Sequence, residues 1–216
     1  MQAFLFDLDG VLLDTAKYHY QAWRAICNQL GFDLSYEENE MLKGIDRVTS
    51  LKLLLDLGKV QLPQIEFEAL LIQKNEHYLK LIEDLTPDDL YEGVLPFFNE
   101  MKNKKIKIGL GSASKNARFI LDKIEITSYF DYIVDGTMTT HGKPDPQVFL
   151  LGAKGCGVNP ENCAVFEDAE AGVEAAITGN MKAIGIGEEK ILNEAHLVYP
   201  HIKDVDLESV LKLFEE

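Results

Sequence analysis

The sequence predicts an α/β fold in which helices cover both faces of a parallel sheet and a helical segment is inserted after the first strand. From residue 88 onward, short apolar runs typical of buried strands alternate with amphipathic helical patterns, and this alternation favours parallel strands. Between Thr15 and Thr86 the pattern is helical throughout. We therefore expect an α/β domain formed by residues 1–14 and 88–216, and a helical domain formed by residues 15–87.

Apolar spacing predicts each element in turn. The first strand is the run at residues 3–6, which ends at Asp7. In the insertion, apolar residues recur at helical spacing over residues 23–30, 51–55 and 67–85, and each pattern stops near a Gly or Pro. Further strands are expected at residues 106–110, 132–134, 163–166 and 183–186, and further helices after Gly93 and at residues 117–124, 146–154, 171–178 and 207–214.

Polar residues follow three of the expected strands, namely Asp7, Ser112 and the pair Glu167-Asp168. Because the carboxyl ends of parallel strands share one edge of a sheet, these residues should converge. Asp7 and Asp9 are two residues apart and would share one face of a regular strand, so both could reach one substrate, and Gly10 permits the chain to turn directly after them. One aspartate could then attack phosphorus or bind a metal while the other transfers a proton. The alternative is that these residues have no catalytic role, because Asp and Gly often end a strand.

The composition limits the possible partners. A formal net charge of −15 argues against nucleic acid and anionic membranes, which require a basic surface. Three cysteines without a Cys-x-x-Cys pair favour buried structural thiols, and no segment approaches the roughly 18 apolar residues of a membrane span. We expect a cytoplasmic protein, most simply a monomer.

The run Asp7-Leu8-Asp9-Gly10-Val11 resembles the first motif of the haloacid dehalogenase superfamily of phosphatases and phosphomutases. Ser112 after an apolar run, Lys143 between Gly142 and Pro144, and Glu167-Asp168 after another apolar run match its further motifs in the right order. The resemblance covers the whole chain and implies a Rossmann-like core with a helical cap. It implies that Asp7 is the phosphorylated nucleophile and Asp9 the general acid and base, that Ser112 binds phosphate, and that Lys143 balances the aspartyl phosphate.

The same resemblance implies a magnesium site formed by the carboxylates of Asp7 and Asp168, the backbone carbonyl of Asp9, and Glu167 in direct or indirect contact with the ion. Mg²⁺ prefers oxygen ligands, which agrees with this set. Helix capping is the alternative for Glu167 and Asp168. A solvated loop lysine is the alternative for Lys143.

A loop of small residues, Gly111 to Asn116, precedes an expected helix, where backbone N–H groups and a hydroxyl can hold an anion. Ser112 and Ala113 would supply such donors. An ordinary helix cap by Ser114 is the alternative. A dinucleotide fingerprint is disfavoured, because the third glycine is missing and the loop does not follow the first strand.

Two segments of the insertion, residues 14–23 and 42–47, resemble the β-phosphoglucomutase family together with residues 112–116. In that family the arginine of the second segment binds the phosphate remote from the reaction, a role that falls on Arg47, and guanidinium groups suit phosphate. Thr15 and His19 would lie at the hinge between cap and core. The implied substrate-binding residues are Asp9, Thr15, His19, Trp23, Lys43, Gly44, Ile45, Arg47, Ser112, Ala113, Ser114, Lys115 and Asn116.

Simpler interpretations exist for three of these residues. Thr15 could be a helix N-cap, His19 a packed core histidine, and Arg47 a member of an exposed surface network. The sequence also departs from the family pattern at Asp46, which places a negative charge near the expected phosphate clamp, and at Ala169, where a serine is common.

The resemblance implies a Mg²⁺-dependent phosphomutase that interconverts β-D-glucose 1-phosphate and D-glucose 6-phosphate through β-D-glucose 1,6-bisphosphate, beneath a cap that excludes water. The same residues would form a sugar-phosphate phosphatase if water reached the aspartyl phosphate. A catalytically silent phosphosugar-binding module is disfavoured, because clustered carboxylates repel an anionic ligand unless a cation is present. The sequence leaves open which hexose phosphate is preferred.

Overall fold

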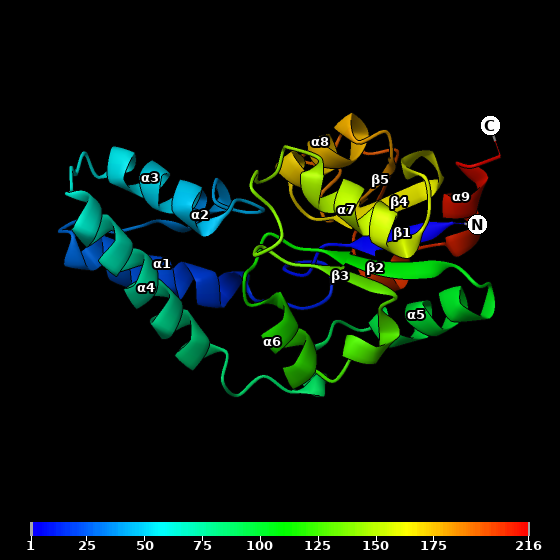
Figure 1. Cartoon of the computed structure of the whole chain (residues 1–216), viewed down its shortest axis with the longest axis horizontal. Coiled ribbons are helices and arrows are strands. Elements are labelled where there is room, and N and C mark those ends of the chain that lie inside the picture. Colours follow the sequence, from blue (N-terminus) through cyan, green and yellow to red (C-terminus); the bar gives the residue numbers. More distant parts are fainter. Residues whose placement is uncertain (1, 216) are drawn as a thin grey trace.

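The computed structural model describes residues 2–215 and contains a parallel sheet beside a group of inserted helices (Figure 1). Neighbouring strands are parallel and follow the order β3-β2-β1-β4-β5-β6. Strand β1 therefore lies inside the sheet, and the motif that follows it emerges within the carboxyl edge. The strands are β1 (Ala3–Phe6), β2 (Lys107–Gly111), β3 (Tyr132–Val134), β4 (Cys163–Glu167), β5 (Lys182–Ile186) and β6 (Leu197–Tyr199).

Helices of the α/β part cover both faces of the sheet. Those of the part after the insertion are α5 (Val94–Asn103), α6 (Ala117–Lys123), α7 (Gln147–Cys156), α8 (Glu170–Thr178) and α9 (Leu207–Lys212). Figure 1 shows α7 and α8 on one side of the sheet and α5 and α6 on the other. The insertion contains α1 (Ala16–Gln29), α2 (Tyr36–Glu40), α3 (Arg47–Leu57) and α4 (Gln64–Leu81).

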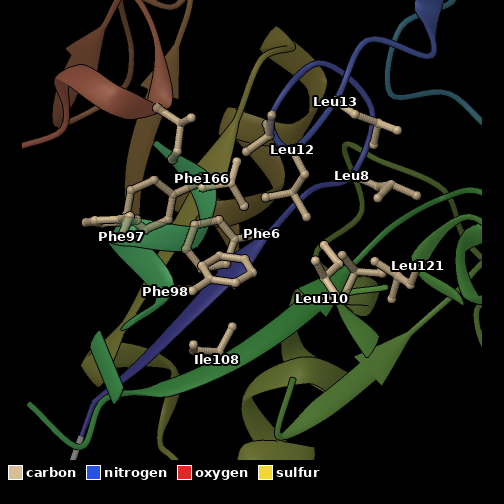
Figure 2. Close-up of a cluster of buried hydrophobic side chains, with 14 of the residues drawn as sticks. Phe6, Leu8, Leu12, Leu13, Phe97, Phe98, Ile108, Leu110, Leu121 and Phe166 are labelled. Atoms are coloured by element: carbon tan, nitrogen blue, oxygen red, sulfur yellow. The ribbon is translucent and has the colours of Figure 1, made fainter. Parts of the chain in front are cut away.

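Strand β1 supplies side chains to both layers of the core, as its alternation requires. Phe4 and Phe6 belong to the apolar cluster that includes α5 and α9, whereas Ala3 and Leu5 belong to the cluster that includes α7 and α8. The Phe6 ring stacks on Phe166 of β4 with 4.6 Å between centroids (Figure 2). Side chains buried on both faces explain why these strands are continuous apolar runs in the sequence.

The predicted α/β fold with a parallel sheet is confirmed, with local differences. Strand β6 and helix α2 were not expected, since β6 has only three half-buried residues and α2 is short and polar. Helix α4 ends at Leu81 rather than near Leu85. Leu85 is buried in the core but does not belong to a helix. Its apolar side chain was therefore a sign of burial and not of a longer helix.

The inserted helices surround an apolar cluster of their own, which includes Trp23, Leu51, Leu54 and Leu70. The chain enters and leaves this region at one place, where Leu13 forms an isolated antiparallel bridge with Leu90. Beside that bridge, the Tyr91 N–H donates to the Leu12 carbonyl at 2.9 Å. The two connections to the insertion are thus tied to each other at the sheet edge.

The three cysteines are buried free thiols, as predicted. Burial raises the pKa of Cys27 to about 12, of Cys156 to about 11 and of Cys163 to about 12. Within residues 2–215, none of the helices combines the length and apolar character that crossing a bilayer requires.

Candidate active site

The chain leaves strand geometry directly after β1, and Asp7 and Asp9 both line one cavity of about 450 Å³. Gly10 has a φ of +82°, a conformation that other residues rarely adopt. A Cβ atom on Gly10 would also lie 2.0 Å from Oδ2 of Asp168. Glycine at this position therefore permits both the turn and the close approach of the acidic loop that follows β4.

Lys143 is the buried cation of the site, not a solvated loop residue. Its Nζ donates to Asp7 Oδ1 at 2.6 Å and to Glu167 Oε1. Burial alone would lower the pKa of Lys143, but the carboxylates of Asp7 and Glu167 outweigh it and raise this pKa. Burial raises the pKa of Glu167 to about 7, although Lys143 opposes the shift. One ammonium group thus holds two buried carboxylates.

Three acids could hold a divalent cation, because oxygen atoms of Asp7, Glu167 and Asp168 lie within 4.8 Å of one another. Burial, and then the charges of Glu167 and Asp7, raise the pKa of Asp168 well above its usual value. A cation would favour the charged forms of all three groups. An all-oxygen donor set with clustered carboxylates fits Mg²⁺.

The hydrogen bonds of Glu167 do not support the helix-capping alternative. Glu167 Oε2 accepts from the backbone N–H groups of Asp168 at 3.0 Å and Ala169 at 3.1 Å, which precede helix α8. The N-cap residue of α8 is Ala169, which has no capping side chain. Because both oxygens of Glu167 are engaged by the protein, Asp168 is better placed to offer its carboxylate directly to a cation.

Asp9 accepts a hydrogen bond from the Thr15 hydroxyl through its Oδ1. Thr15 occupies the N-cap position of α1, but its side chain makes no capping hydrogen bond. Burial, and then the charge of Asp7, raise the pKa of Asp9 to about 6, while the Thr15 hydrogen bond opposes the shift. A carboxyl group with a pKa near neutrality can both release and accept a proton at physiological pH.

The loop after β2 is organised by side-chain hydroxyls. Ser112 is fully buried, and its Oγ accepts from the Ser114 N–H at 3.1 Å. Ser114 Oγ in turn accepts from the Asn116 N–H at 3.2 Å. Asn116, not Ser114, is the N-cap residue of α6, so the capping alternative for Ser114 is not observed. Both hydroxyls keep a proton that could be donated to an anion.

Most of the predicted site residues line this single cavity, namely Asp7, Asp9, His19, Trp23, Lys43, Gly44, Ile45, Arg47, Ala113, Ser114, Lys115 and Asp168. The other five lie behind its wall and contact residues that line it. These are Thr15, Ser112, Asn116, Lys143 and Glu167. The structure therefore brings the whole predicted set together at the junction of the sheet edge and the insertion.

The unexpected acid, Asp46, caps helix α3. Its Oδ1 accepts from the N–H groups of Val48 at 2.9 Å and Thr49 at 3.2 Å, an arrangement that stabilises a helix N-terminus. Arg47 follows it, is half buried and donates from Nη2 to Asn75 Oδ1 at 2.7 Å. Burial lowers the pKa of Arg47. The interpretation of Arg47 as part of an exposed network is therefore wrong.

Sequence reasoning missed Lys74 of helix α4, which also lines the cavity and is 2% exposed. Its Nζ lies 2.8 Å from His19 Nδ1 and 4.7 Å from the ring centroid of Tyr78. Burial, and then the charge of Arg47, lower the pKa of Lys74 to about 7, and burial also lowers the pKa of His19. The available signal was a lysine at helical spacing between Leu70 and Tyr78, two apolar positions that are buried.

Comparisons with known proteins agree on one family. The model of haloacid dehalogenase-like hydrolases matches residues 1–180. A β-phosphoglucomutase of Bacillus subtilis (strain 168) is 41% identical over 218 residues, which cover 100% of this chain and 96% of that protein. Fructose-1-phosphate phosphatase YqaB of Escherichia coli (strain K12) is 31% identical over 183 residues, which cover 84% of this chain and 94% of that protein.

Solved structures show the same similarity. The crystal structure of β-phosphoglucomutase from Clostridium difficile aligns with a TM-score of 0.96 and 39% sequence identity, over 100% of this chain and 97% of that chain. The similarity therefore extends over the sheet, the acidic loops and the inserted helices together.

Proposed function

Because the chain belongs to the haloacid dehalogenase-like hydrolase family, we propose that it interconverts β-D-glucose 1-phosphate and D-glucose 6-phosphate through β-D-glucose 1,6-bisphosphate. One observation carries the proposal. A single cavity is lined by Asp7 and Asp9 from the sheet edge and by Arg47 from the insertion. A bisphosphate needs two anion-binding ends, and such a cavity offers a reactive end and a cationic end to one ligand.

In the proposed reaction, an Asp7 carboxylate oxygen attacks one phosphorus of the bisphosphate, and the bond between that phosphorus and the sugar oxygen breaks. Asp9 gives its proton to the leaving oxygen, which becomes the free hydroxyl of the product. The reverse step transfers the phosphoryl group from Asp7 to a sugar hydroxyl while Asp9 takes the proton. Lys143, 2.6 Å from Asp7, offsets the charge near the aspartyl phosphate.

Asp7, Asp168 and the backbone carbonyl of Asp9 would hold Mg²⁺ with Glu167 beside it, and the ion would neutralise charge on the transferring phosphoryl group. The Ser112 hydroxyl and the Ala113 N–H would bind oxygens of the same group. These assignments are supported by the clustering of the acids and by the buried hydroxyl next to the cavity.

The intermediate must turn end for end, so the binding residues have to accept either phosphate. We assign the remote phosphate to Arg47 and the sugar to a set that includes residues of both domains. Residues 15–87 would act as a cap that closes over the site and keeps water from the aspartyl phosphate, with Thr15 and His19 at its hinge. The sugar-contacting residues would be Trp23, Lys43, Gly44, Ile45, Ser114 and Lys115, while Asn116, behind the cavity wall, would hold the loop that carries Ser114 and Lys115.

A sugar-phosphate phosphatase is the second candidate, since a protein named fructose-1-phosphate phosphatase is also similar to this chain. The two reactions differ in whether a sugar hydroxyl or water accepts the phosphoryl group. We would incubate the protein with β-D-glucose 1-phosphate, Mg²⁺ and a trace of glucose 1,6-bisphosphate, and measure glucose 6-phosphate against free phosphate. Glucose 6-phosphate without phosphate release is expected. Stoichiometric free phosphate would establish the phosphatase instead.

Replacing Asp9 by asparagine should slow phosphoryl transfer by about 10²- to 10⁴-fold, the usual contribution of a general acid and base. Sugar phosphate binding should change little, because the amide keeps the shape of the side chain. Rapid-quench measurement of single turnovers separates the two effects. Asp14→Asn, at a half-exposed aspartate on the same segment, is the matched control. An unchanged single-turnover rate for Asp9→Asn would exclude proton transfer at this residue.

Replacing Arg47 by alanine should cost about 2–4 kcal/mol of transition-state stabilisation, because a phosphate would lose its charged partner in a half-buried site. The measurement is kcat/KM for β-D-glucose 1-phosphate. Arg24→Ala is the matched control, since Arg24 lies in the same insertion but pairs with Asp33 at the surface. Equal kcat/KM values for the two variants would show that Arg47 does not bind the remote phosphate.

A further inference from the structure

We propose that Asn75 is a positioning residue for the remote phosphate: its amide oxygen orients Arg47 and Asn116 from the two domains without neutralising the arginine. The inference rests on the proposed function. Asn75 Oδ1 accepts from Arg47 Nη2 at 2.7 Å and from Asn116 Nδ2 at 2.9 Å. Helix α4 therefore links the start of helix α3 to the loop before helix α6 through one atom.

The chemistry of the three side chains fixes which atoms meet. A guanidinium group can only donate hydrogen bonds, so the atom of Asn75 that faces Arg47 must be its carbonyl oxygen. Asn116 then has to present its NH₂ group to the same oxygen. The arrangement uses one N–H of Arg47 and leaves the others available to a ligand.

Asn75 acts through its neighbours and not on the ligand. Arg47 and Lys115 line the cavity, while neither Asn75 nor Asn116 belongs to its wall. The Asn116 N–H donates to Ser114 Oγ at 3.2 Å, so holding Asn116 also holds the loop that carries Ser114 and Lys115. Loss of the Asn75 oxygen would release the arginine and this loop together.

The neutrality of the amide is the specific part of the inference. An aspartate could hold the same two donors, and its charge would strengthen both hydrogen bonds. It would also cancel the charge of Arg47 and weaken the attraction for a phosphate dianion. The neighbouring Lys74 does not take the place of Arg47, because its Nζ lies 2.8 Å from His19 Nδ1. Asparagine therefore orients Arg47 and preserves the positive charge.

The test compares Asn75→Ala and Asn75→Asp with the unaltered protein. Titration calorimetry measures the affinity for D-glucose 6-phosphate in the presence of Mg²⁺, and steady-state assays measure KM and kcat for β-D-glucose 1-phosphate. Gln73→Ala is the matched control, because Gln73 lies on the same helix and its side chain donates to Gln29 of the insertion at 2.6 Å, away from Arg47 and Asn116. Thermal unfolding shows whether each variant is folded.

We expect Asn75→Ala to weaken glucose 6-phosphate binding and raise KM by about 10- to 100-fold, the range for a hydrogen bond to a charged group, with a smaller change in kcat. Asn75→Asp should bind glucose 6-phosphate at least 10-fold more weakly than the unaltered protein, although it keeps both donors in place. Gln73→Ala should match the unaltered protein.

The outcomes separate this inference from the proposed function. A merely structural link would be preserved by the carboxylate, so wild-type affinity in Asn75→Asp would overturn the inference. Wild-type affinity in Asn75→Ala would overturn it too, while mutase activity of the unaltered protein would leave the proposed function intact. If Asn75→Ala does not fold, Asn75→Asp, which is nearly equal in volume, decides the question. Failure of the unaltered protein to bind glucose 6-phosphate would overturn both.

Discussion

Replacing Asp7 by asparagine is expected to lower turnover by roughly 10⁴- to 10⁶-fold, the scale seen when a covalent nucleophile is removed. An amide cannot attack phosphorus to form an aspartyl phosphate. The fold should survive, because the asparagine oxygen can still accept the hydrogen bond that Lys143 now gives to Asp7 at 2.6 Å. The measurement is steady-state conversion of β-D-glucose 1-phosphate to glucose 6-phosphate.

A second readout places the phosphoryl group directly. Intact-mass measurement after mixing with glucose 1,6-bisphosphate should show a phosphorylated form of the unaltered protein and none of Asp7→Asn. Equal unfolding midpoints in urea would show that the substitution leaves stability unchanged. Activity within tenfold of the unaltered protein, or a phosphoryl group found on another residue, would remove Asp7 as the nucleophile.

Replacing Lys143 by methionine should destabilise the metal-free protein by about 3–5 kcal/mol at pH 8, the cost of removing one partner from a buried ion pair. The substitution leaves the buried carboxylates of Asp7 and Glu167 without their shared cation. Urea unfolding in the presence of a chelator measures the effect. Adding Mg²⁺ should restore part of the lost stability, because the ion would supply positive charge to the same carboxylates.

The loss of stability in Lys143→Met should be larger at high pH than at low pH. Burial already raises the pKa of Glu167 to about 7, and without Lys143 this pKa should rise further. A group with a raised folded-state pKa favours folding at low pH, and this contribution disappears as the pH rises through the pKa. The deficit of Lys143→Met should therefore be smaller at pH 5 than at pH 8.

A surface ion pair provides the control for this experiment. Lys190 and Glu188 are paired at 2.6 Å but largely exposed, with side-chain exposures of 77% and 63%. Lys190→Met should lower the free energy of unfolding far less than Lys143→Met does, because exposed ion pairs contribute little to stability. If Lys143→Met cost no more than this control at pH 8, Lys143 would not be the counter-charge of the buried acids.

The strand ends of the site were predictable because they follow from topology. Asp7, Ser112 and Glu167 were each recognised next to an apolar run, and parallel pairing of β1, β2 and β4 places such positions along one edge. The local apolar pattern and one general property of parallel sheets were sufficient to predict that these residues converge. The same reasoning gave the alternation of strands and helices, since a strand buried on both faces is apolar throughout.

Other features depend on distant contacts that no local pattern contains. Strand β6, Leu197–Tyr199, is an apolar run as short as β3, but its three residues are only half buried at the edge of the sheet, and it was missed in the sequence. Asn75 looks like an ordinary polar position of a helix until α3 is placed against it, whereas Lys74 falls on the helix face of Leu70 and Tyr78 but finds its partner His19 only on α1. Helix α2 did leave a signal, because Ser35 and Glu38 form a capping box that is readable in the sequence.

The pairing of Leu13 with Leu90 has a consequence for how such enzymes diversify. Because the two connections are fixed side by side, the segment between them is a closed loop with both ends at one place on the sheet. The entropic cost of closing a loop grows only slowly with its length. The segment between the connections can therefore lengthen, shrink or change its lining without disturbing the order of the strands. Evolution can retune substrate selection there while the phosphoryl-transfer machinery stays constant.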